Sequence, residues 1–181
     1  MKKRLLRGII KSIYVLVLVC ASMNATANPM DRIEIVFGPR VGFSYTMMNP
    51  EEFTNQVNDF IGTEGTEYIP FMTQFGLSVE QRIVLGTTKS HFVFQELVTV
   101  GGFDQSIAIP TIATLLGFRS DIGFEVGMGP IWSPDGFAVV FAGGWTFSYK
   151  DVYVPVDIVF VPDFQEYHHR IGLYTGFNFN I

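Results

Sequence analysis

Cysteine is almost absent from the sequence. The chain contains a single cysteine, Cys20, which lies in an N-terminal apolar run. Lipid modification of this cysteine would need a small residue before it, and Val19 is not small. Cleavage after Ala27 would remove Cys20 and leave a mature chain without a thiol. We therefore expect no disulfide, no cysteine nucleophile and no thiolate metal site.

A long hydrophobic run is also missing. The apolar segment from Ile13 to Val19 is far shorter than the roughly 20 residues of a membrane-spanning helix. It follows a basic stretch and precedes Ala25, Thr26 and Ala27, which is the order of a cleavable secretory signal. We expect residues 1–27 to be a signal peptide and residues 28–181 to form one exported domain.

Positive charge is scarce in the mature part. Only 7 of the 12 Lys and Arg follow residue 27, against 17 Asp and Glu, a net charge of about −10. Such a surface repels nucleic acid, so no nucleic-acid partner is expected. The only lysines left are Lys89 and Lys150, both at expected turns. A water-soluble barrel would need many more charges on its outside.

What the mature chain does have is alternation. Apolar residues recur at every second position, which places them on one face of a strand. Eight such segments are expected, at 33–46, 69–82, 91–101, 107–118, 123–131, 137–149, 152–160 and 168–181. An even number of antiparallel strands can close into an up-and-down barrel without exposed edges.

The chemistry of the two strand faces decides which one looks outward. The less apolar face consists of Gly, Ser, Thr and Ala with isolated Arg and Glu, which suits a narrow interior. The aromatic and branched face would then contact lipid. The expected fold is therefore all-β, an eight-stranded antiparallel transmembrane β-barrel in the cell outer membrane.

Four acids and four arginines fall on the expected interior face. An unpaired buried charge is very costly, so a balanced set is expected to pair and plug the barrel. The alternative is a pathway for protons or ions. The set is Glu34, Arg40, Glu80, Arg82, Arg119, Glu125, Asp157 and Arg170.

The connections after odd-numbered strands carry acids and no Lys or Arg. With the N-terminus in the periplasm, these connections face outward, including the longest one, at 48–67. Acidic loops can attract divalent cations. No ordered ligand spacing is present, so we predict no metal site and no cofactor.

The longest connection contains a helix signature. Asn49, Pro50 and Glu52 predict a helix start, and Gly62 predicts its end. One face of this helix is apolar, and it could cover the barrel mouth, lie on the membrane interface or dock a partner. The apolar face consists of Phe53, Val57, Phe60 and Ile61.

The last segment alternates up to the final residue, with Ile171, Leu173, Thr175, Phe177, Phe179 and Ile181 on one face. It resembles the terminal strand of outer-membrane β-barrel proteins, although Ile181 stands where Phe or Trp is usual. In architecture the whole chain resembles small barrels of the OmpA and OmpX type. The resemblance implies outer-membrane lipid, lipopolysaccharide and the outer-membrane assembly machinery as partners, and a monomer.

Three functions follow from this reading. The expected one is a non-enzymatic outer-membrane barrel that stabilises the membrane or presents its acidic loops. The second is an enzyme modifying outer-leaflet lipid, for which His168 and His169 beside Glu166 are the candidates, although no serine stands beside them. The third is a secreted or periplasmic barrel that binds a small apolar ligand.

Overall fold

The computed structural model describes residues 33–84, 90–150, 152–163 and 168–180. The expected signal peptide, residues 1–27, lies outside this range, as do Lys89, Glu166 and Ile181. The elements in chain order are β1 Ile33–Thr46, α2 Pro50–Ile61, β2 Phe71–Val84, β3 His91–Gly101, η1 Phe103–Gln105, β4 Ile109–Arg119, β5 Phe124–Ser133, β6 Gly136–Tyr149, β7 Val152–Val161, β8 Arg170–Gly176 and β9 Asn178–Asn180.

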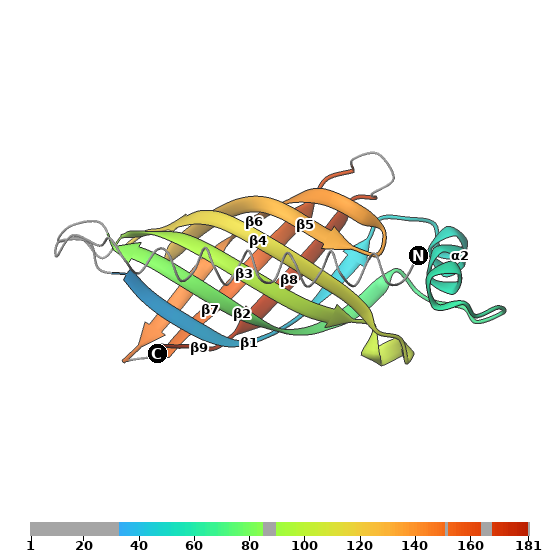
Figure 1. The fold of residues 1–181 in the computed structure, drawn as a ribbon, viewed down its shortest axis with the longest axis horizontal. Coiled ribbons are helices and arrows are strands. Elements are labelled where there is room, and N and C mark those ends of the chain that lie inside the picture. The colour runs from blue at the N-terminus through green and yellow to red at the C-terminus, as the bar shows by residue number, and fades with distance from the viewer. Residues whose placement is uncertain (1–32, 85–89, 151, 164–167, 181) are drawn as a thin grey trace, which may run out of the picture.

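The strands form a closed antiparallel barrel (Figure 1). Each pairs with its neighbours in sequence, and β1 pairs with β2 on one side and with β8 on the other. β8 and β9 are two parts of one strand, because the register with β1 is the same before and after Phe177. The expected eight-stranded barrel is confirmed.

The stagger of the strands sets the size of the barrel. A path along paired residues starts at Ile35 in β1, crosses all the strands and returns to β1 at Tyr45, ten residues further along. In a barrel of this kind the strands tilt by roughly 35–45°, and eight strands leave an interior just wide enough for side chains.

The two faces of the sheet have the expected polarity. In β1, Phe43 is 44% exposed whereas its neighbour Ser44 is 1% exposed. Each strand from β1 to β8 carries large apolar side chains on its exposed face; examples in chain order are Phe43, Leu77, Val98, Leu116, Met128, Phe141, Ile158 and Leu173. Small and polar residues take most of the inner face.

Helix α2 packs on the end of the barrel at which β1 ends and β2 begins (Figure 1). The Asn49 side chain accepts a hydrogen bond from the Glu51 N–H at 3.0 Å, and Gly62 ends the helix with a φ of 75°. Phe53 and Val57 are buried in one cluster with Met48, Tyr68, Met72, Ile107 and Ile109. Two residues of the expected apolar face, Phe60 and Ile61, are instead exposed. Among the described residues, no helix is long and apolar enough to cross a membrane.

Candidate functional site

The centre of the barrel interior is a buried carboxylate held by two arginines. Glu80 on β2 is 0% exposed. Arg82 donates from Nε to Glu80 Oε1 at 2.6 Å, and Arg119 on β4 donates from Nη1 to the same oxygen at 2.5 Å. Arg119 Nη2 also reaches Glu80 Oε2 at 3.1 Å. Such charge-assisted, two-pronged contacts are among the strongest hydrogen bonds in proteins.

A second carboxylate balances the second arginine. Glu125 on β5 accepts from Arg119 Nε at 2.7 Å, and Arg119 Nη2 also bonds it. The hydroxyl of Thr146 on β6 donates to Glu125 Oε1 at 2.6 Å. Two acids and two arginines thus form a neutral chain, Arg82–Glu80–Arg119–Glu125, across strands β2, β4 and β5. We call these four residues the charge cluster.

The charge cluster is linked to β1 through the last strand. Asn178 on β9 is 0% exposed, and it donates from Nδ2 to Glu80 Oε2 at 3.2 Å. Its Oδ1 accepts from Arg40 Nη1 at 2.7 Å. Sequence reasoning missed Asn178 because only charged side chains were considered as members of an interior bonded network. The alternation of Asn178 with the outward Phe177 and Phe179 could have predicted that its side chain faces the interior.

Of the other expected interior charges, Asp157 lies beside Glu125 of the charge cluster, whereas Glu34 and Arg170 lie toward opposite ends of the barrel. Asp157 on β7 lines two small cavities on the side of the charge cluster that faces α2. Glu34 on β1 lines the open space on the other side. Arg170 starts β8 at the opposite end of the barrel, where its Nη2 donates to Asp135 Oδ2 at 2.9 Å. The structure therefore separates Arg170 from the charge cluster.

The free space inside the barrel is divided by the charge cluster. On the side away from α2, a vestibule of about 570 Å³ is lined by residues that include Arg82, Arg119 and Tyr153. The Tyr153 ring lies 4.1 Å from the Arg82 guanidinium carbon. On the other side, the cavities among the described residues include two small ones of about 30 and 40 Å³. Each is comparable to the volume of a single water molecule.

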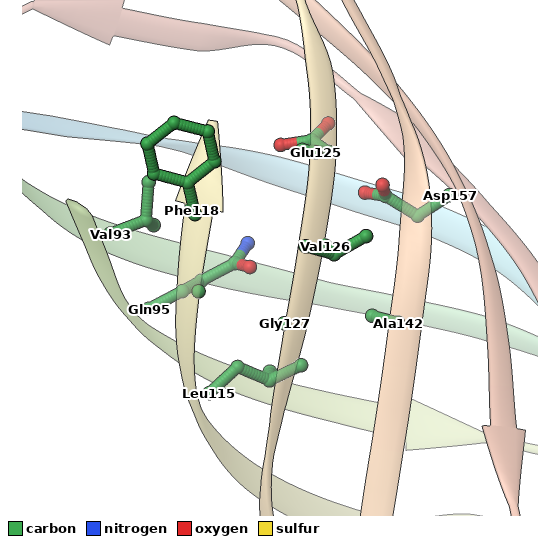
Figure 2. A pocket seen from close by; sticks show the side chains of 10 residues that line it. Val93, Gln95, Leu115, Phe118, Glu125, Val126, Gly127, Ala142 and Asp157 are labelled. Atoms are coloured by element: carbon green, nitrogen blue, oxygen red, sulfur yellow. The ribbon is translucent and has the colours of Figure 1, made fainter. Parts of the chain in front are cut away.

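Figure 2 shows the cavity of about 30 Å³, which the carboxylates of Glu125 on β5 and Asp157 on β7 line from either side of β6. Gln95 and Leu115 line it from the opposite side. Beyond it, strands β4 to β7 contribute a buried apolar cluster, whereas strands β1 to β3 contribute buried polar side chains such as Ser44, Gln74 and Thr99. The apolar cluster consists of Ala113, Leu115, Ile131, Ala138, Val140 and Val161. Side chains therefore fill the barrel from the charge cluster to the end that carries α2.

The connections at the α2 end are tied to one another. Gln105 donates from Nε2 to the Phe71 carbonyl at 2.7 Å, and its Oε1 accepts from the Ile69 N–H at 2.7 Å. Asp104 accepts from the Thr73 hydroxyl at 2.6 Å and from the Thr73 N–H at 3.0 Å. Partial burial opposes the charged form of Asp104, but the bonds from Thr73 outweigh it and lower the pKa of the carboxyl.

The histidines expected as candidate catalytic residues hold loops in place. His168 Nε2 lies 3.6 Å from Glu52 Oε1 of helix α2. His169 accepts the Asp163 N–H on Nδ1 at 2.9 Å, and its ring stacks on Phe160. Within the described residues, no group of three His, Cys, Asp or Glu side chains could hold a metal ion.

No protein-family model matches the chain, and no curated protein matches it significantly. Among solved structures, the chain is similar to the crystal structure of Ail, the attachment invasion locus protein of Yersinia pestis. The alignment has a TM-score of 0.27 and 7% identity, and it covers 83% of this chain and 98% of that chain. A similarity this low carries no argument about function.

Proposed function

We propose that this chain is a non-enzymatic β-barrel of the outer membrane that acts through its surface rather than through a pore or an active site. The apolar exposed wall is the observation that carries this proposal. Leu77 on β2 and Leu116 on β4 are each 64% exposed, and Ile158 on β7 is 59% exposed. Soluble monomers rarely expose contiguous apolar patches beyond a few hundred Å².

A continuous apolar outer surface favours contact with lipid rather than with water. The exposed apolar face continues round all eight strands, and strands β1 to β7 have 10 to 14 residues. A tilted strand of about 9–11 residues spans a bilayer. In a closed barrel every backbone group of the sheet can pair, which is the condition for a strand to cross hydrocarbon.

The filled interior favours a structural or surface role over transport. In the part of the chain that the structure describes, the charge cluster, the side chains between it and α2, and helix α2 itself leave no wide path along the axis. The acidic residues of α2, among them Glu51 and Glu52, would face the exterior if the α2 end is external. The partners proposed for this surface are outer-membrane lipid and lipopolysaccharide. The outer-membrane assembly machinery would recognise the last strand.

Cell fractionation tests the location. After expression in a double-membraned bacterium, we expect the protein in the outer-membrane fraction, with gel migration that changes on heating. N-terminal sequencing should find the mature chain starting after Ala27. Recovery of the protein from the soluble periplasm would contradict the proposal and favour a ligand-binding barrel.

Two assays test the lack of pore and enzyme activity. Purified protein in planar bilayers should give no steady conductance, because the interior is filled. The mass spectrum of lipid A should be the same in cells with and without the protein. A steady open channel or a changed lipid A profile would each overturn the corresponding part of the proposal.

A further inference from the structure

One acidic side chain lies on the outer wall of the barrel rather than inside it. Glu96 on β3 pairs in register with Val79 on β2, which is 40% exposed, and with Thr114 on β4. Directly opposed residues of a sheet share a face, and successive residues alternate. The neighbours of Glu96 in sequence, Gln95 and Leu97, line the interior cavities. Glu96 therefore faces outward.

Glu96 is the one charged residue on the outward face of the described strands. It is the sixth of the eleven residues of β3, so it lies midway between the two ends of that strand. Under the function proposed above, this position is deep in the hydrocarbon of the bilayer. Ionisable residues at such depth are costly and rare, and they mark functional sites by default.

Glu96 has few polar neighbours on the outer wall of its own barrel. Its Oε1 is buried against its own barrel and has no hydrogen-bond partner among the described residues, so Oε2 is the carboxyl oxygen that would face a second copy. Among the outward side chains around it, Leu77, Val98 and Leu116 are aliphatic and more than half exposed. Phe94 on β3 is aromatic, and Gln81 on β2 is polar and buried. Thr114 is the polar residue directly opposite. The exposed wall around the carboxyl is therefore an apolar face with one polar centre.

We propose that this face, made by Leu77, Val79, Glu96, Val98, Thr114 and Leu116, is the contact between two copies of the chain in the membrane. Two copies inserted in the same direction are related by an axis along the membrane normal. Such a symmetry places the same residue of each copy at the same depth. The carboxyl of one copy then meets the identical carboxyl of the other.

A carboxyl group suits this arrangement chemically. In hydrocarbon the neutral acid is favoured over an isolated carboxylate, and the neutral acid both donates and accepts a hydrogen bond. Two identical acids therefore satisfy each other, and the aliphatic side chains around them can pack. This dimer differs from the monomer expected from the sequence. The sequence analysis assigned Glu96 to neither the interior nor the loops.

Cysteine cross-linking in isolated outer membranes tests the interface, because the mature chain is expected to have no cysteine of its own. Val98→Cys places a thiol next to Glu96, and Ile158→Cys on β7 is the matched control on a different wall. We expect a disulfide-linked dimer from Val98→Cys and little from Ile158→Cys. Adding Glu96→Leu to Val98→Cys should lower the dimer yield about tenfold, whereas Glu96→Gln, which still donates and accepts, should largely preserve it.

Equal cross-linking at the two cysteine positions would overturn the interface, and so would a dimer yield that Glu96→Leu does not change. A cross-linked product whose mass shows a different protein would also overturn it. Leucine on a lipid-facing wall should not impair folding, and heat-modifiable migration of each variant checks this. The inference rests on the proposed function, and the two fail in different ways. Absence of the unmodified protein from the outer membrane would overturn the location, and with it this interface.

Discussion

Gly38 lies where β1 and the last strand approach most closely. A Cβ at this position would lie 1.5 Å from the Phe177 carbonyl oxygen, so no side chain fits without moving the backbone. Gly143 on the outer face of β6 is a useful contrast, because its nearest neighbouring atom would be 3.8 Å away. We expect Gly38→Ala to lower the free energy of unfolding by about 1–3 kcal/mol. Gly143→Ala should change it by less than about 0.5 kcal/mol.

Urea unfolding in lipid vesicles, followed by heat-modifiable gel migration, measures both glycine variants. Equal midpoints for Gly38→Ala and Gly143→Ala would show that the seam between β1 and the last strand is looser than the structure indicates.

Glu80 is the residue on which the charge cluster depends. Glu80→Gln removes the carboxylate that both Arg82 and Arg119 bond, and breaking a buried ion pair in this way costs about 3–5 kcal/mol. The double variant Glu80→Gln, Arg82→Met restores neutrality and should regain part of the loss. The unfolding midpoint in urea measures both. A single variant as stable as the wild type would show that the charge cluster contributes nothing.

Asp104 gives a pH dependence outside the membrane-spanning strands. Because its pKa is lowered, the bonds from Thr73 stabilise the fold at pH values above the ordinary pKa of aspartate. This contribution is lost as the pH falls through the lowered pKa. We expect an NMR titration in micelles to find the pKa of Asp104 below its ordinary value, and Thr73→Val to raise it. An unchanged pKa in Thr73→Val would contradict this origin.

At the scale of elements, helix α2 depends on few contacts. Phe53 is 4% exposed, whereas Phe60 on the same helix is 49% exposed. Phe53→Ala should weaken docking of the helix by about 3 kcal/mol, because it removes a buried ring. Hydrogen exchange should then become faster in α2 and stay unchanged in the strands. Phe60→Ala is the control, and an equal effect of the two variants would mean that the helix is not packed as described.

Most elements could be predicted from the sequence because their two faces differ. The bounds of β1 and β3 agree with the alternation, and the described ends of the other strands differ from it by at most two residues. The helix start was readable at Asn49 because a cap needs a particular side chain. The short helix η1 was missed, since it ends on a left-handed Ser106 that has no strong sequence signal.

The interior was harder to predict than the elements. On β4 and β5 the inward residues Leu115 and Ile131 are as apolar as their outward neighbours, so alternation could not place them. The expectation of a charged interior was therefore accurate for only one part of the barrel. The pairing of Glu80 with Arg119 also could not be predicted from spacing, because it depends on the register between β2 and β4, which are not adjacent strands.

At the scale of the whole molecule, the apolar wall makes a depth-dependent prediction. Phe141 lies within β6, and Tyr149 is its last residue; both face outward. In lipid, Phe141→Arg should cost about 2–4 kcal/mol, whereas Tyr149→Arg near the interface should cost about 0–1 kcal/mol. Urea unfolding from vesicles measures both. Equal costs at the two positions would argue against a bilayer around this wall.

The seam that closes the barrel also has a consequence for the timing of folding. Arg40 on β1 bonds Asn178, which is 138 residues further along the chain. This contact cannot form before almost all of the described chain has been delivered, and such distant contacts make folding slow. Until then, the edges of β1 and β8 remain open to pairing with other chains. Aggregation therefore competes with folding of this barrel until β1 has paired with the last strand.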